Sequence, residues 1–113
     1  MLYNYKVKDI LKVYDGDTIT VILDLGFGIN KIEKIRLLYI NAPEIKGSER
    51  PLGLKSKKFL KNILLNAILE KKNIIIKTKK DRKGKYGRYL GEIFVDNISI
   101  NKLMITEGYA KKY

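Results

Sequence analysis

The apolar residues of this chain change their period after residue 40, and that change sets the order of its first elements. Three runs come first, at residues 5–14, 18–23 and 31–40. The first mixes apolar and polar positions, the second is β-branched and alternates, and the third has two distinct faces, all of which is typical of strands. The loop "NAPEIKGSERPLG" follows. After it, apolar residues recur every three or four positions, which predicts a helix from about Leu52 to Leu69 with Pro51 at its N-terminal edge.

The third run, "KIEKIRLLYI", is expected to pair with the second. Read as one continuous strand, it has two faces. One face carries Ile35, Leu37 and Tyr39, and the other carries Arg36, Leu38 and Ile40.

The second half of the chain predicts two more strands, residues 73–79 and 89–95, and a short helix in "SINKLMITEG". Ser99 and Gly108 suit the two caps of that helix, and Asp96-Asn97 suits a turn before it. Three strands, a helix, two strands and a helix is the usual chain order of an OB-fold. We therefore expect a single α+β domain over residues 1–113, mainly β: a five-stranded OB-fold barrel with two helices packed against it.

Composition limits the chemistry that such a domain can perform. The 113 residues include no cysteine and no histidine, so an enzyme here would rely on carboxylates, Tyr, Lys, Arg, Ser or Thr, or on a hard metal held by oxygens. Lys and Arg number 24 against 12 acids, a formal charge of +12. That charge favours a polyanionic partner, with nucleic acid first and an anionic membrane surface second. A lysine-rich, solvated surface is the plain alternative.

The sequence shows no signal for export or for membrane insertion. The first 16 residues show no signal peptide, and no window is apolar enough for a membrane span. The expectation is a cytoplasmic monomer with no membrane partner. Removal of an N-terminal signal from the precursor would instead mean secretion.

Acidic and amide side chains come directly before the second strand and directly after the third. Asp15-Gly16-Asp17 precedes the second strand, and Asn41 and Glu44 follow the third. In an antiparallel pair these positions share one end, so Asp17, Asn41 and Glu44 could converge on a hard cation, Ca²⁺ or Mg²⁺. The plain alternatives are an Asx-type turn for "DGD" and a proline-containing loop for "NAPE".

Two arginines stand out among the basic residues. Arg36 lies between Ile35 and Leu37, so its charge needs either a partner or a solvated face, and a phosphate is one such partner. Arg88 ends "GKYGR", in which Lys85 and Tyr86 offer a second charge and an aromatic ring for a nucleotide. Basic loops of this kind are common, so "KYGR" alone is a weak signal of nucleotide binding.

Taken together and in this order, "DGDT", "RLLYINAPE", a helix and "KYGR" resemble the staphylococcal (micrococcal) nuclease family, from about Val7 to Lys111. The resemblance implies an OB-type barrel and a calcium-dependent endonuclease, a hydrolase of phosphodiester bonds. Its expected partners are DNA and RNA, with single-stranded or frayed substrates preferred and with little sequence specificity.

The resemblance also implies a calcium site. Asp17 would be the acidic ligand, and Asn41 and the backbone carbonyl of Ala42 would complete the set. Asp15 would lie next to these ligands without binding the ion directly, and Thr18 would support their loop.

For catalysis and substrate binding, the resemblance implies five further roles. Arg36 and Arg88 would clamp the scissile phosphate, and Glu44 would orient or deprotonate the attacking water. Lys85 and Tyr86 would hold the terminal phosphate and the sugar.

One ligand position departs from the family pattern. Relatives usually have an aspartate where this chain has Asn41, so we expect weaker calcium binding, because affinity depends on the charge of the ligands. A catalytically weakened OB module that binds single strands or a protein partner is therefore the alternative function. Arg36, Glu44 and Arg88, which decayed domains tend to lose, are all present and favour the enzyme. A basic RNA-binding protein would explain the charge but not the convergent acids.

Overall fold

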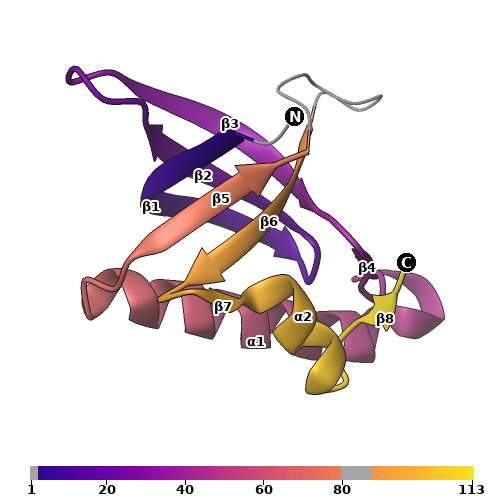
Figure 1. Cartoon of the computed structure of the whole chain (residues 1–113). Helices are drawn as coiled ribbons and strands as arrows, with labels where there is room; N and C mark the ends of the chain where they lie inside the picture. Colours follow the sequence, from indigo (N-terminus) through magenta and orange to yellow (C-terminus); the bar gives the residue numbers. More distant parts are fainter. Residues whose placement is uncertain (1–2, 80–87) are drawn as a thin grey trace.

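The computed structural model describes residues 3–79 and 88–113. Five strands close into a barrel: β1 (Tyr3–Asp15), β2 (Thr18–Asp24), β3 (Asn30–Leu37), β5 (Ile74–Thr78) and β6 (Tyr89–Val95). They follow the order β3-β2-β1-β5-β6, and a parallel pairing of β3 with β6 closes the barrel, whereas the other pairs are antiparallel (Figure 1). The predicted OB-fold barrel of five strands is confirmed.

Both helices lie against the same end of this barrel (Figure 1). A 3₁₀ turn, η1 (Gly47–Glu49), leads into α1 (Arg50–Leu69), which has Pro51 in its first turn and buries Leu60, Leu64 and Ala67 against the strands. These residues recur at the helical spacing that predicted α1.

The short helix α2 (Ile100–Thr106) starts at Ser99, whose hydroxyl accepts a hydrogen bond from the N–H of Lys102. Its C-cap is Glu107, one residue earlier than expected. Gly108 comes next, with φ of 79°, where a glycine avoids strain.

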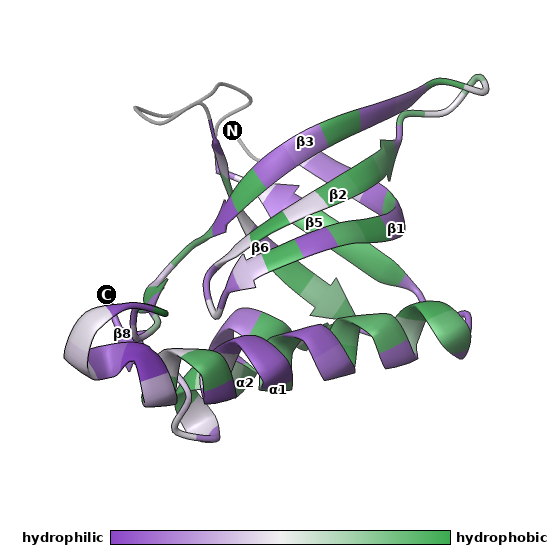
Figure 2. Cartoon of the chain, turned by 180° about the vertical axis from the view of Figure 1, so that it is seen from behind, coloured by the Kyte–Doolittle hydropathy of each residue, from purple (hydrophilic) through white to green (hydrophobic). Residues whose placement is uncertain are grey.

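The core fills the space between the barrel and α1. Strand residues alternate between this core and solvent, and Figure 2 shows the alternation as bands of opposite hydropathy. Fully buried side chains come from nearly every barrel strand and from both helices: Ile19, Val21, Ile35, Ile76, Ile93, Leu60, Leu64 and Met104. Within the described part of the chain, neither helix combines the length and the apolar character needed to cross a bilayer.

Strand β1 departs from simple alternation. Its register against β2 shifts three times, between Val7 and Asp9, Ile10 and Lys12, and Val13 and Asp15. Each bulge adds one residue, so the buried positions of β1 are Val7, Ile10 and Val13, three residues apart, while Leu11 is 48% exposed. Bulges sharpen the twist of a strand, which lets β1 pair with both β2 and β5 around the barrel.

The third predicted strand is shorter than its sequence pattern indicated. β3 ends at Leu37, the chain turns through Leu38 and Tyr39, and Ile40–Asn41 forms the short strand β4. Tyr39 has a φ of 70° and is 48% exposed, whereas Ile40 is fully buried. The predicted faces are therefore wrong after Leu37, because the turn exchanges inside and outside. β4 pairs with β8 (Lys111–Lys112), and β7 (Ile98–Ser99) pairs in antiparallel orientation with the end of β6.

Candidate active site

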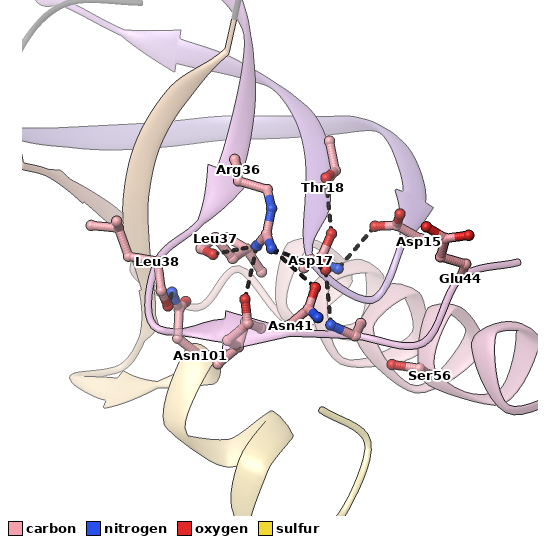
Figure 3. Close-up of polar contacts among 12 residues, drawn as sticks. Asp15, Asp17, Thr18, Arg36, Leu37, Leu38, Asn41, Glu44, Ser56 and Asn101 are labelled. Atoms are coloured by element: carbon pink, nitrogen blue, oxygen red, sulfur yellow. Dashed lines mark hydrogen bonds and ion pairs between the residues drawn. The ribbon is translucent and has the colours of Figure 1, made fainter. Parts of the chain in front are cut away.

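Asp17 lies at the centre of the polar cluster in Figure 3. Its side chain is 8% exposed and comes from the turn between β1 and β2. Thr18 Oγ1 donates to Asp17 Oδ1 (3.0 Å), and the N–H of Ala42 donates to Asp17 Oδ2 (2.9 Å). One carboxylate therefore joins the turn before β2 to the loop after β4, as the antiparallel pairing of the two strands predicted.

Arg36 reaches the same carboxylate from β3. Its Nη1 donates to the carbonyls of Leu37 (2.7 Å) and Ile40 (3.0 Å), and its Nη2 lies 3.4 Å from Asp17 Oδ2 and 3.5 Å from Asn41 Oδ1. The side chain is 16% exposed. The arginine thus has the partners that its apolar neighbours required, and four contacts fix the direction of its planar guanidinium.

Asp15 forms the Asx-type turn that the sequence offered as an alternative. Its Oδ1 accepts a hydrogen bond from the N–H of Asp17 (3.0 Å). Burial, together with the interactions with the carboxylate of Asp17, raises the pKa of Asp15 to about 6. Two carboxylates that oppose each other's ionisation create a negative potential that a cation would relieve.

The oxygens of this cluster suit a hard cation. Asp17 Oδ2 and Asn41 Oδ1 both lie within 3.5 Å of Arg36 Nη2, so the two oxygens are close together, and the N–H of Ala42 donates to the same Asp17 oxygen. Across residues 3–79 and 88–113, no group of three Asp, Glu, His or Cys side chains is placed to hold an ion. A metal would therefore need the mixed set of carboxylate, amide and carbonyl oxygens, which is chemistry that Ca²⁺ accepts.

Glu44 lies on the same loop, two residues after Ala42, and its side chain is exposed. Its N–H donates to Glu49 Oε2 (3.0 Å), which ties the loop to the start of α1. In Figure 3, Glu44 and Asp15 lie near each other at the right of the cluster, and Arg36 lies nearer its centre, beyond Asp17. A cavity of about 370 Å³ opens beside the loop, lined by Asn41, Glu44 and Glu49 among others.

The remaining predicted residues lie at the start of β6. Arg88 is half-buried and comes directly before Tyr89, which pairs with Ile35 in the parallel register of β3 and β6. The backbone of Arg88 therefore lies next to the strand that carries Arg36. Lys85 and Tyr86 fall outside the described residues.

Asn101 is a contributor that sequence reasoning missed. It is fully buried on α2, and its Nδ2 donates to the carbonyls of Leu38 (2.8 Å) and Gly91 (3.2 Å) while its Oδ1 accepts from the N–H of Ile93 (3.0 Å). It thereby ties the turn after β3 to β6. An asparagine within the apolar positions of "SINKLMIT" was the available signal.

Strand β8 supports the loop from the other side. Asn41 pairs with Lys111, the N–H of Tyr113 donates to the carbonyl of Tyr39 (2.9 Å), and the Tyr113 ring centre lies 5.9 Å from the guanidinium carbon of Arg36. The last residues of the chain thus hold the strand that presents Asn41.

Two glycines let backbones approach closely at the site. A Cβ on Gly53 would lie 2.2 Å from the carbonyl oxygen of Glu44, and one on Gly16 would lie 2.1 Å from Ser56 Oγ. Atoms at these separations would overlap. The close approach of α1 to the loop of Glu44 therefore requires Gly53 on the helix, and its close approach to the turn between β1 and β2 requires Gly16 in that turn.

We expect Gly53→Ala to destabilise the protein by about 1–3 kcal/mol, the usual cost of overpacking. Alanine has the higher helix propensity by up to about 1 kcal/mol, so the propensity alone predicts the opposite sign. Urea unfolding measures the free energy of unfolding of Gly53→Ala and, for comparison, of Asn66→Ala at an exposed position of α1. The comparison separates the effect of overpacking from that of helix propensity. A Gly53→Ala protein as stable as the parent would show that the loop of Glu44 yields freely.

Comparisons with known proteins identify the relatives of this arrangement. The family model described as "Staphylococcal nuclease homologue" matches residues 34–113. The chain is 31% identical to an uncharacterized protein, MJ1439, of Methanocaldococcus jannaschii, over 92% of this chain and 58% of that protein. It is 31% identical to endonuclease YncB of Bacillus subtilis, over 88% of this chain and 44% of that protein. It is 36% identical to an uncharacterized endonuclease of Haemophilus influenzae, over 92% of this chain and 51% of that protein.

These matches agree with the fold and with the resemblance drawn from the motifs. The chain spans between 44% and 58% of the length of these three relatives. Since the family model covers well over half of the 113 residues, this chain belongs to the family of staphylococcal nuclease homologues.

Proposed function

We propose that this domain is a calcium-dependent nuclease that hydrolyses phosphodiester bonds of DNA and RNA with little sequence preference. One observation carries the proposal: three separate segments meet at the carboxylate of Asp17, which contacts Arg36 and the N–H of Ala42, while Arg36 also contacts Asn41. Family membership and the endonuclease names of two relatives support it. The net charge of +12 suits a polyanionic substrate.

The calcium ion would be held by the carboxylate of Asp17, the amide oxygen of Asn41 and the carbonyl of Ala42. Asp15 and Thr18 would keep Asp17 in position, through the N–H bond and the hydroxyl bond described above. When bound, such an ion neutralises negative charge that develops on the phosphate. The ion would lie near the positive charge of Arg36, so we expect it to bind more tightly when an anionic phosphate is present.

The side chains of the protein supply the rest of the reaction. Arg36 and Arg88 would donate hydrogen bonds to the phosphate oxygens, and Arg36 is already fixed in direction by carbonyl groups. Glu44 would accept a proton from water as the water oxygen bonds to phosphorus and the ester bond breaks. The leaving oxygen then takes up a proton. Lys85 and Tyr86 would bind the terminal phosphate and sugar, a role that rests on the resemblance alone.

Low specificity follows from the kind of contact. All of these groups would bind phosphate or sugar, and such contacts carry no direct information about the base. DNA and RNA would both be accepted, with single-stranded or frayed regions preferred.

The direct test is hydrolysis of heat-denatured DNA and of RNA by purified protein. We expect cleavage with added calcium and none after chelation with EDTA, with recovery when calcium is restored in excess. Binding of denatured DNA without hydrolysis in any divalent metal would favour the alternative, a catalytically weakened binding module, to which the neutral Asn41 points.

Asn41→Asp should tighten calcium binding, because a carboxylate replaces a neutral amide in the ligand set. Asn41 is exposed and aspartate has nearly the same shape, so we expect the fold to be retained. Calorimetric titration with calcium measures the change. We expect at least a tenfold lower Kd, with Asn62→Asp on the exposed face of α1 as the matched control. An identical Kd in the parent and in Asn41→Asp would mean that position 41 does not contact the ion.

A further inference from the structure

The outer face of the sheet β1-β2-β3 carries a compact basic cluster beside the candidate site. Lys12 Nζ lies 4.4 Å from the centre of the Tyr14 ring, and Lys34 Nζ lies 4.2 Å from the same centre. Thr20 Oγ1 donates to the Tyr14 hydroxyl oxygen (3.1 Å). Three adjacent strands thus contribute to one cluster: Lys12 and Tyr14 from β1, Thr20 from β2 and Lys34 from β3.

The strand register explains why these residues meet. Lys12 pairs with Thr20, and Thr20 pairs with Lys34, so the three form one row across the sheet. Tyr14 lies at the third bulge of β1, between Val13 and Asp15, where the register skips a residue. Such a bulge redirects a side chain, and here the ring is brought over the row toward β2 and β3.

The next row of the same sheet belongs to the candidate site. Thr18 pairs with Arg36, and Lys34 precedes Arg36 by two residues on β3. Residues two apart share a face, and they lie roughly 6.6 Å apart along a strand. A stacked nucleic acid strand advances about 3.4 Å for each nucleotide. A strand with its phosphate at Arg36 would therefore bring another phosphate to Lys34 within about two nucleotides.

The positive charges of the cluster are available to bind an anion. Among residues 3–79 and 88–113, neither Lys12 nor Lys34 forms an ion pair with a carboxylate. The pKa of Tyr14 is lowered, first by the hydrogen bond from Thr20 and also by the charges of Lys34 and Lys12. Two ammonium groups near one ring are poorly neutralised, and a phosphate group would balance both charges.

The basic surface continues beyond Lys12. A groove of about 220 Å³ lies between β1 and α1, and its lining includes Lys12, Lys57 and Lys61. Lys12 therefore connects the row on the sheet to two lysines on the helix. Lys34 precedes Arg36 by two residues on β3, Lys12 shares the Tyr14 ring with Lys34, and Lys57 and Lys61 line the same groove as Lys12. We refer to these five side chains as the basic path.

We propose that Lys12, Tyr14 and Lys34 bind the backbone of a single-stranded nucleic acid, about two nucleotides away from the phosphate held at Arg36. The path continues toward Lys57 and Lys61. This inference deepens the proposed nuclease function and rests on it for the position of the scissile phosphate. The contact is with phosphate groups, so it adds affinity for longer strands without adding sequence preference.

The test measures binding of a fluorescent 16-nucleotide oligothymidylate by anisotropy, over a series of salt concentrations and without added metal. Lys12→Ala/Lys34→Ala should raise the Kd about tenfold or more at 0.1 M salt and lower the slope of log K against log salt by about 1.4, since each contact with a single strand contributes about 0.7. Tyr14→Leu should raise the Kd about two- to fivefold, because the ring no longer holds the ammonium groups.

Lys77→Ala/Lys102→Ala is the matched control. It removes the same charge, and Lys77 also lies over an aromatic ring, 4.7 Å from the centre of Phe94, but on β5, which pairs with β1 and β6 rather than with β2 or β3. Lys102 is exposed on α2. We expect the control to change the Kd less than twofold. An equal loss in both double variants would overturn the proposal, because net charge alone would then explain the binding. A Kd for Tyr14→Leu equal to that of the parent would overturn the role of the ring.

A second measurement separates this inference from the nuclease function. The ratio of kcat/KM for the 16-mer to kcat/KM for a dinucleotide should fall about tenfold in Lys12→Ala/Lys34→Ala. If the parent protein binds the 16-mer through these lysines but never cleaves it, the proposed nuclease function is wrong and the proposed binding surface is supported. If Lys12→Ala/Lys34→Ala cleaves normally and its kcat/KM ratio is unchanged, the proposed binding surface is wrong and the nuclease function is supported. Loss of binding to phosphatidylserine vesicles without loss of oligonucleotide binding would assign the cluster to a membrane surface instead.

Discussion

Glu44→Gln should lower the rate of DNA hydrolysis by about 10²- to 10⁴-fold, the usual contribution of a general base. Glutamine keeps the shape of the side chain and removes the group that would accept the proton from water. The side chain is exposed, and the bond to Glu49 comes from the backbone N–H, so the fold does not depend on the carboxylate. Steady-state hydrolysis of heat-denatured DNA at saturating calcium measures the loss, and circular dichroism checks the fold.

Glu49→Gln is the control for this prediction. It makes the same change of charge in the same cavity, and an amide oxygen can still accept the N–H of Glu44. Most of the rate should remain. Equal rates in Glu44→Gln and the parent would place the base elsewhere, and an equal loss in both variants would indicate that the charge of the cavity matters rather than one proton acceptor.

Asn101→Leu should cost about 3 kcal/mol or more of the free energy of unfolding. The change leaves the carbonyls of Leu38 and Gly91 and the N–H of Ile93 without their bonds to Asn101, and each such buried group costs about 1–3 kcal/mol. For a domain of this size, the melting temperature should fall by more than about 10 °C. Urea and thermal unfolding provide the two measurements.

The comparison is with Asn62→Leu, an exposed position on α1. This surface change should stay within about 0.5 kcal/mol of the parent. If Asn101→Leu unfolds at the same urea concentration as the parent, water or a shifted backbone replaces the bonds of the asparagine. The tie between α2 and the turn after β3 would then be dispensable.

The sequence predicted the barrel because its local patterns agree with the tertiary structure. β6 begins and ends where the alternation of "YLGEIFV" does, and α1 ends at Leu69 as its apolar period indicated. The errors come from positions where the backbone leaves its regular path. The positive φ of Tyr39 reverses inside and outside after Leu37, and the bulges of β1 turn a period of two into one of three. Hydropathy alone carries no signal for the turn at Tyr39, whereas Val7, Ile10 and Val13 already recur in the sequence at the period of three that the bulges produce.

The site was predicted only in part, for a similar reason. Pairing β2 with β3 was enough to bring Asp17 beside the loop of Asn41 and Ala42, because register is fixed by the buried face. The contacts of Arg36 with the carbonyls of Leu37 and Ile40 depend on the turn between β3 and β4, which the alternation concealed. The pairing of β4 with β8 links residues about seventy positions apart and has no local signal. The roles assigned to the site residues stay predictions until the variants are measured.

The pairing of β8 with β4 has a practical consequence for anyone who prepares this protein. Residues attached after Tyr113, such as an affinity tag, would begin beside a ring whose centre lies 5.9 Å from the guanidinium carbon of Arg36, where substrate is expected to bind. Assays on such material would underestimate turnover through simple obstruction.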